Sequence, residues 1–337
     1  MRYGFRDIPL KAVAAYLENL FRIKVLGDER NLKPMLSGFY ITRNCNFRCG
    51  YCAFRDNNDK GLNTGETKEI LGKIRRVTPG ITLTGGEPLL RPDIIEILKE
   101  AKRLKFKPII LFTNLSLLDS KEEVLEYVDI VSTSLDRVDD RYDELTNVKG
   151  SAKKIMDNIV KYSKLQDERG FTINVNCVIG EHNMDNVSEV AGFVFENNCG
   201  LSIGPVVERG AAPEYLKDNE EYKRIMDRII EMKREGYPIN TSLRFLETVR
   251  DFKPFKCRPF IIPRIFSNGD VFHPCEVLKE KSGNLLEHDS YEELIEGFQR
   301  DEFRCDRTCF IACYGEPSLL IDHPLDVIKE FACRTRH

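Results

Sequence analysis

Short apolar runs and amphipathic stretches alternate along residues 36–235. Six apolar runs have the length of strands and fall at 38–42, 81–84, 108–113, 130–134, 172–178 and 201–206. The segments between them carry apolar residues three and four apart, which predicts helices over 68–77, 93–104, 121–127, 152–166, 186–197 and 220–235. This order predicts an α/β fold with parallel strands joined by right-handed crossovers. Six such units fit a partial (β/α)6, TIM-like barrel, whose chemistry collects at the C-terminal ends of the strands.

Two further segments flank this core. Residues 8–26 repeat apolar residues at helical spacing, which favours a helix packed on the domain, with a helix on a membrane surface or lining a lipid entrance as the alternative. Beyond Tyr237-Pro238 the sequence is richer in Pro and Cys, and Asn268-Gly269 predicts a hairpin turn. We therefore expect an N-terminal helical segment (1–35), the core (36–237) and a small Cys-rich C-terminal extension (238–337).

Composition narrows the function classes. A net charge of −3 over 337 residues gives no basic excess of the kind that marks a general nucleic-acid surface. No run of 18 apolar residues predicts a membrane-spanning helix, and Arg2, Arg6, Asp7 and Lys11 interrupt any signal-peptide core. The eleven cysteines are largely clustered, which without a secretory signal favours metal binding over disulfides. A cytoplasmic location is therefore expected.

Three of the cysteines, Cys45, Cys49 and Cys52, lie on one loop directly after the first predicted strand. Three thiolates hold three corners of a [4Fe–4S] cluster and leave its fourth iron open to a small molecule. The alternatives are zinc, whose structural sites take four ligands, and a disulfide, which would leave one cysteine over.

This triplet, with Tyr51 before its last cysteine, resembles the signature of the radical S-adenosylmethionine (SAM) superfamily. In that family the open iron chelates SAM, and the reduced cluster cleaves SAM to methionine and a 5′-deoxyadenosyl radical. The resemblance places Tyr51 beside the adenine. It extends to Gly85, Gly86, Glu87 and Pro88 after the second strand, which resemble the family's GGEP motif for the SAM amino group.

Polar residues also end the following strands. By the same resemblance, Asn114, Ser134 and Asp136 hold the SAM ribose and carboxylate, and Asn176 lies near the adenine and methionine. For Ser134 and Asp136 the competing interpretation is helix capping. Strand alternation turns Cys177 away from Asn176, so Cys177 is expected to be a buried apolar residue.

A second cysteine group lies in the extension and consists of Cys257, Cys275, Cys305, Cys309 and Cys313. If helical, the last three share one face. Four of the five would close a second [4Fe–4S] cluster, and structural zinc is the alternative. The group resembles the shortened, twitch form of the SPASM extension, and which four residues would ligate is left open.

Looser segments, among them Ile173–Cys177, resemble the adenosylhopene synthase group, in which the radical adds to an isoprenoid alkene. This favours a small-molecule or lipid substrate with peripheral membrane contact, and an electron donor such as ferredoxin or flavodoxin. Phe112 stands where that group has a hydrogen-donating cysteine. The alternatives are a radical SAM maturase of ribosomal peptides and, from another class, a non-enzymatic carrier with two clusters. The first site offers such a carrier one ligand too few.

Overall fold

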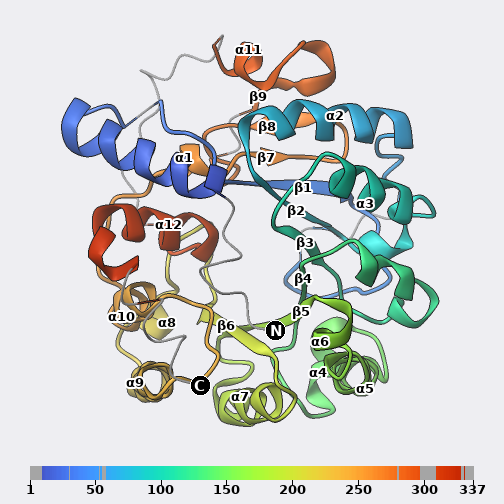
Figure 1. Cartoon of the computed structure of the whole chain (residues 1–337). Coiled ribbons are helices and arrows are strands. Elements are labelled where there is room, and N and C mark those ends of the chain that lie inside the picture. The colour runs from blue at the N-terminus through green and yellow to red at the C-terminus, as the bar shows by residue number, and fades with distance from the viewer. Residues whose placement is uncertain are drawn as a thin grey trace.

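The computed structural model describes residues 10–29, 31–52, 54, 58–278, 281–296, 309–327 and 330. Within them one open sheet of nine strands has the order β6-β5-β4-β3-β2-β1-β7-β8-β9. The strands are β1 (Leu36–Thr42), β2 (Gly80–Gly85), β3 (Ile109–Phe112), β4 (Ile130–Ser134), β5 (Thr172–Ile179), β6 (Gly200–Pro205), β7 (Arg264–Ile265), β8 (Asp270–Phe272) and β9 (Lys281–Asn284). All neighbours from β6 to β7 are parallel, so the partial barrel predicted from the sequence is confirmed (Figure 1).

Helices follow the strands as the sequence predicts. The main ones are α2 (Thr64–Val77), α3 (Ile94–Arg103), α5 (Ser151–Ser163), α7 (Val187–Glu196) and α9 (Glu220–Glu235), with short α4 (Arg141–Thr146), α6 (Gln166–Arg169) and α8 (Glu214–Lys217) between them. The helix α2 begins at a capping box in which Asn63 and Glu66 satisfy each other's backbone amides. The predicted helix over 121–127 is a 3-10 helix over Glu122–Glu126.

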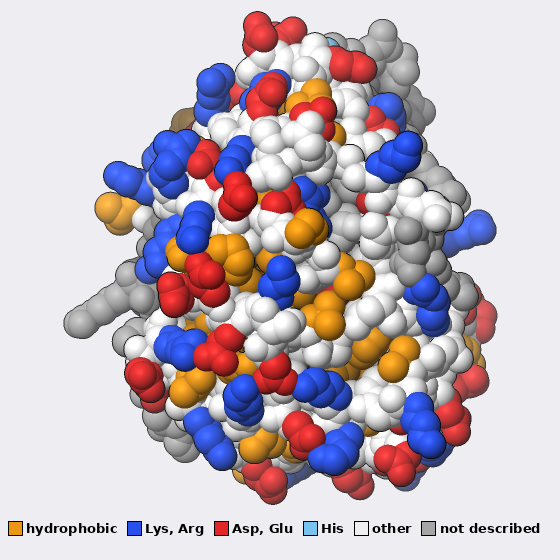
Figure 2. Space-filling view, turned by 90° about the vertical axis from the view of Figure 1, so that its right-hand side faces the viewer, with side chains coloured by type: hydrophobic (Ala, Val, Ile, Leu, Met, Phe, Trp, Pro, Cys, Tyr) orange, Lys and Arg blue, Asp and Glu red, His pale blue; other side chains and the backbone are white. Residues whose placement is uncertain are grey.

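The main core lies between the sheet and these crossover helices. Alternate strand residues face the helices and are almost fully buried, for example Leu83, Leu111, Val131 and Val175. Cys177 belongs to this core, so its predicted apolar environment is confirmed. The opposite face of the same strands points into the barrel lumen. On the helix-covered side, acidic and basic side chains are interspersed with apolar ones (Figure 2).

The C-terminal extension continues the sheet beyond β1. It contains α10 (Leu243–Arg250), the strands β7–β9, α11 (Tyr291–Glu296) and α12 (Ala312–Asp322). Strand β7 pairs in parallel with β1, and β8 and β9 follow antiparallel. The predicted turn at Asn268-Gly269 is confirmed, because Gly269 has φ +87° and joins β7 to β8.

The N-terminal helix α1 (Leu10–Phe21) continues as a π-helical turn over Arg22–Leu26 and packs on the extension. Its Tyr16 hydroxyl donates to the Leu320 carbonyl at 2.9 Å, and Tyr16 contacts a second small core that includes Phe260, Ile261 and Tyr314. The packed helix expected from the sequence is therefore present. Leu10, Leu17, Phe21 and Val25 on its outer side are exposed. In the described part of the chain no helix is both long and apolar enough to cross a membrane.

Candidate functional site

The cysteine loop leaves the C-terminal end of β1, where the barrel rule places chemistry. Backbone amides point at its sulfurs: Phe47 N lies 3.4 Å from Cys45 Sγ, and Phe54 N lies 3.3 Å from Cys52 Sγ. A third bond, from Cys52 N to the Cys49 carbonyl at 3.2 Å, folds the loop on itself. Amide donors of this kind stabilise thiolate charge around a metal cluster.

The electrostatic environment separates Cys45 and Cys49 from reactive cysteines. Burial raises the pKa of Cys45, and it raises the pKa of Cys49 to about 11, with further rises from the charges of Cys52 and Cys45. Thiols with raised pKa values are poor nucleophiles at neutral pH. Binding to iron would deprotonate all three and remove their mutual repulsion.

The three thiols of the loop act on one another. The charge of Cys52 acts on Cys45, and the charges of Cys52 and Cys45 act on Cys49. Across the described ranges no three Cys, His, Asp or Glu side chains converge on the position of one metal ion. A cubane cluster binds each thiolate to a different iron, so its ligands stand further apart than the four ligands of zinc.

The glycine pair at the end of β2 supports this loop directly. A Cβ on Gly85, whose φ is +138°, would lie 2.0 Å from the Thr42 carbonyl oxygen, and a Cβ on Gly86 would lie 2.2 Å from that of Asn44. Gly86 N donates to the Thr42 carbonyl at 2.9 Å. Only glycine permits this approach, so the pair holds the backbone that enters the cysteine loop.

Glu87 is fully buried behind that pair. Its carboxylate accepts hydrogen bonds from the Thr113 hydroxyl at 2.7 Å, Asn114 N at 2.7 Å and Leu89 N at 2.9 Å. Burial nevertheless raises the pKa of Glu87 to about 7, because these neutral donors compensate its desolvation only in part. These hydrogen bonds make the buried carboxylate a link between the ends of β2 and β3.

Side chains at the end of β3 connect to the cysteine loop. Asn114 Nδ2 donates to Asn46 Oδ1 at 2.8 Å, and Asn46 Nδ2 donates to the Ser116 hydroxyl at 2.8 Å. Asn114 therefore bridges β3 and the loop, although the sequence suggested for it only contact with SAM. From the other side of the loop, Arg48 N donates to the Thr146 carbonyl at the end of α4 at 2.9 Å.

The remaining residues predicted to contact SAM differ in how exposed their side chains are. Tyr51 and Ser134 are exposed at the loop and the end of β4. Asp136 is only 3% exposed and accepts from Val178 N at 2.8 Å, so it joins the ends of β4 and β5. Asn176 is half-buried, faces the lumen and donates to the Ser132 hydroxyl at 2.7 Å.

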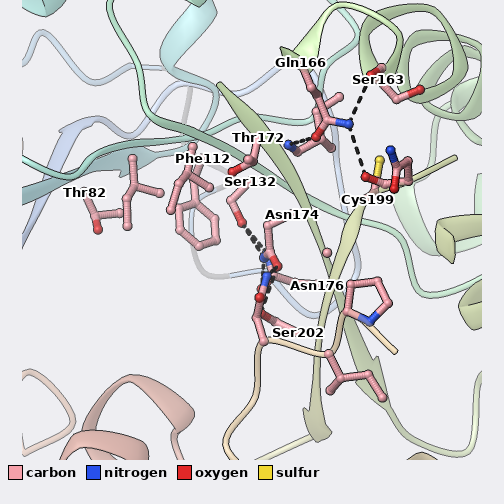
Figure 3. Close-up of a pocket in the computed structure, with 18 of the residues that line it drawn as sticks. Thr82, Phe112, Ser132, Ser163, Gln166, Thr172, Asn174, Asn176, Cys199 and Ser202 are labelled. Atoms are coloured by element: carbon pink, nitrogen blue, oxygen red, sulfur yellow. Dashed lines mark hydrogen bonds between the residues drawn. The ribbon is translucent and has the colours of Figure 1, made fainter. Parts of the chain in front are cut away.

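A cavity of about 720 Å³ occupies the lumen beneath this site. One wall is apolar, with Ile110 and Phe112 of β3. The other carries a hydrogen-bonded polar array of five side chains: Ser132, Asn174, Asn176 and Ser202, which Figure 3 labels, and Asn240. Four of these five were not singled out from the sequence. The signal was present on β5, where polar Thr172, Asn174 and Asn176 alternate with apolar residues.

Four members of the second cysteine group lie within the described residues, and Cys305 lies outside them. Cys257 and Cys313 contact the small core that also touches Val277. Cys309 packs beside Gly210, where a Cβ would lie 2.8 Å from its Sγ and 3.7 Å from Val277. Burial raises the pKa of Tyr314, and the charges of Cys313 and Cys275 add to the rise, so both thiols lie near this ring.

These four cysteines all lie in the extension, and their positions follow from its tertiary packing. The helical face expected for Cys309 and Cys313 does not form, because α12 begins at Ala312 and Cys309 precedes it. Burial raises the pKa of the Cys313 thiol while Arg264 lowers it, so a cation stands beside this candidate ligand.

The comparisons with known proteins agree with this geometry. Residues 39–194 match the model of the radical SAM superfamily, and residues 204–332 match a domain of unknown function, DUF3463. This chain carries a radical SAM domain. The domain covers β1 to α7, including the cysteine loop and the glycine pair.

Curated relatives cover different shares of the chain. A GTP 3′,8-cyclase of Clostridium perfringens is 30% identical over 172 residues, 48% of this chain and 52% of the relative, so the chain spans about half the length of such relatives. The sporulation killing factor maturation protein SkfB of Bacillus subtilis is 25% identical over 314 residues, 88% of this chain and 73% of that protein.

Solved structures show the same fold over most of the chain. SuiB of Streptococcus suis, bound to precursor peptide SuiA, aligns with a TM-score of 0.62 at 20% identity and covers 93% of this chain and 76% of SuiB. The protein anSMEcpe, with bound AdoMet and a peptide, aligns with a TM-score of 0.58 at 18% identity and covers 89% of this chain and 96% of that one. Both are of the SPASM/twitch type that the cysteines of the extension predicted. The resemblance to adenosylhopene synthase stays a prediction.

Proposed function

We propose that this protein is a radical SAM enzyme that binds a [4Fe–4S] cluster through Cys45, Cys49 and Cys52 and cleaves SAM reductively. The observation that carries the proposal is the locked entry to the cysteine loop, where Gly85 and Gly86 lie against the backbone of residues 42–44 within a radical SAM domain. When bound, the cluster supplies the electron that splits the sulfonium C–S bond, drawn from a donor such as ferredoxin or flavodoxin.

The residues of this chain bind and orient SAM. Under this proposal Glu87 Oε2 and the backbone of Gly85–Pro88 accept the amino group, and the exposed ring of Tyr51 stacks beside the adenine. Ser134, Asp136 and Asn114 lie at the ends of β3 and β4 for the ribose and carboxylate, and Asn176 on β5 lies near the adenine and methionine. The lumen below then holds the substrate away from water, as a primary carbon radical requires.

For the substrate, two observations favour a peptide over an isoprenoid. The lumen presents a wall of amides and hydroxyls, which can exchange hydrogen bonds with a peptide backbone but not with an isoprenoid chain. SkfB, whose alignment spans 88% of this chain, is named for the maturation of the sporulation killing factor, and SuiB was solved with a precursor peptide. We therefore propose peptide modification, with Cys257, Cys275, Cys309 and Cys313 as candidate ligands of an auxiliary cluster.

Anaerobic reconstitution followed by dithionite and SAM tests the proposal. We expect 5′-deoxyadenosine by mass spectrometry and a SAM-dependent change in the EPR spectrum of the reduced cluster. A loaded protein that shows neither signal would overturn the assignment. Incubation with peptide and isoprenoid extracts separates the two substrate classes, because only the true substrate gains or loses mass under turnover.

A further inference from the structure

One buried arginine faces the lumen from the extension. Arg264 on β7 is 8% exposed and lines the cavity. It pairs in register with Gly38 of β1, which pairs with Thr82 of β2. A Cβ on Gly38 would lie 2.1 Å from Arg264 Nη1, so the space that admits the guanidinium exists because residue 38 has no side chain.

The partners of Arg264 leave its donors underused. The nearest carboxylate oxygen, Oε1 of Glu276, lies 3.5 Å from its Nε, and that Nε has no hydrogen-bond partner. Glu276 already accepts from the Tyr40 hydroxyl at 3.0 Å through its other oxygen. Its other neighbours are the Cys313 thiol, with which it interacts, and the face of Tyr314, with the guanidinium carbon 5.6 Å from the ring centre.

Another buried arginine shows what a purely structural role looks like. Arg137 is 2% exposed and donates to Asp139, to Asp185 and to the His182 carbonyl, with Nε 2.8 Å from Asp139 Oδ1. A guanidinium carries five N–H donors, and leaving them unpaired in a buried site is costly. Arg264 is also buried, but its Nε has no hydrogen-bond partner and it faces one carboxylate at 3.5 Å and a thiol, where Arg137 has two carboxylates and a carbonyl.

We propose that Arg264 binds an oxyanion of the substrate, a carboxylate or a phosphate, within the lumen. The guanidinium matches the planar, two-oxygen geometry of such groups. Asn174, Asn176 and Ser202 on the same cavity would then hold the neutral polar part of the substrate. This proposal rests on the proposed function, because only that function identifies the bound molecule as the substrate.

Thermal unfolding of the anaerobically reconstituted protein tests the site with inorganic phosphate and acetate, at constant ionic strength set with chloride. Binding to the native state raises the midpoint by mass action, and we expect a rise of a few degrees when the probe is well above its dissociation constant. The double variant Arg264→Gln/Glu276→Gln removes both charges, so no orphan charge stays buried, and it should lose this rise. Glu276→Gln alone removes a carboxylate that competes for Arg264, and this variant should show a larger rise in the unfolding midpoint.

The pair Arg250→Gln/Asp227→Asn, which removes an exposed ion pair, is the matched control and should respond like the wild type. A response to phosphate alone or to acetate alone supports the site and identifies the group it takes. Equal responses in the wild type and the Arg264→Gln/Glu276→Gln variant, or no response of the wild type to either probe, would overturn the site. The thermal unfolding measurement needs no turnover. A failure of SAM cleavage would therefore overturn the proposed function without changing this result.

Discussion

The two cysteine groups are built in opposite ways. Cys45, Cys49 and Cys52 come from one loop of eight residues, held by the ends of β2 and β3. The described members of the second group come from distant points of the extension, where Cys257 and Cys313 pack against the small core and Cys309 lies beside Gly210. The first site depends on a local backbone clamp, the contact of Gly85 and Gly86 with the backbone of residues 42–44. The second site depends on the packing of the whole extension. This contrast predicts that a substitution in one cysteine group removes the cluster of that group and leaves the other site intact.

The largest expected effect is the loss of the first site. Replacing Cys49 by Ala removes one of three cluster ligands, so we expect complete loss of SAM cleavage and of roughly the iron of one cluster. Iron analysis and 5′-deoxyadenosine formation measure it. Cys177→Ala is the matched control, because that buried thiol faces the helices and should cost only about 1 kcal/mol of stability. Cleavage by the Cys49 variant would refute the site.

The second largest effect is expected from a substitution in the clamp. Gly86→Ala would place a Cβ 2.2 Å from the Asn44 carbonyl oxygen and should cost about 3 kcal/mol or more, with poor cluster loading. Gly72→Ala is the control, because nothing lies within 4 Å of its added Cβ in the middle of α2. That change should stabilise the protein by about 0.5–1 kcal/mol. Denaturant unfolding compares the two, and similar stabilities would show that the clamp is dispensable.

A smaller effect is expected from the second group. Cys275→Ala should remove roughly half of the iron and leave SAM binding at the first site, as read by EPR. The physical reason is that Cys275 belongs to the extension, whereas the cysteine loop is held by contacts with β2, β3 and the end of α4. Complete loss of the SAM-dependent signal in this variant would show that the two groups are coupled and would break the comparison.

The smallest effect concerns pH. Burial raises the folded-state pKa of Glu87 from 4.5 to about 7, so the folded state binds the proton more tightly than the unfolded state. Its contribution to stability is therefore complete below about pH 4.5 and is lost as the pH rises through about 7. Glu87→Gln should be less stable overall, with a flatter fall in unfolding free energy between pH 5 and 7. Identical slopes would mean that Glu87 stays ionised throughout.

Much of this arrangement follows from sequence periodicity. The boundaries of β4 and α9 match their predictions, and the cysteine triplet marks the end of β1. The lumen was harder to predict. The alternation of polar and apolar residues along β5 could be recognised in the sequence, but Asn240 and Arg264 lie outside long periodic segments. They reach the lumen because Gly200 and Gly38 leave room for them, which is a property of the tertiary fold.

The position of β1 has a consequence for how the chain is synthesised. It is an interior strand, flanked by β2 and by β7 of the extension, and Gly38 N donates to the Pro263 carbonyl at 3.0 Å. At a ribosomal rate of about 5–20 residues per second, β1 waits on the order of tens of seconds for this neighbour. During that interval its free edge needs shielding, so a nascent chain stalled before β7 is the species that a chaperone would have to protect.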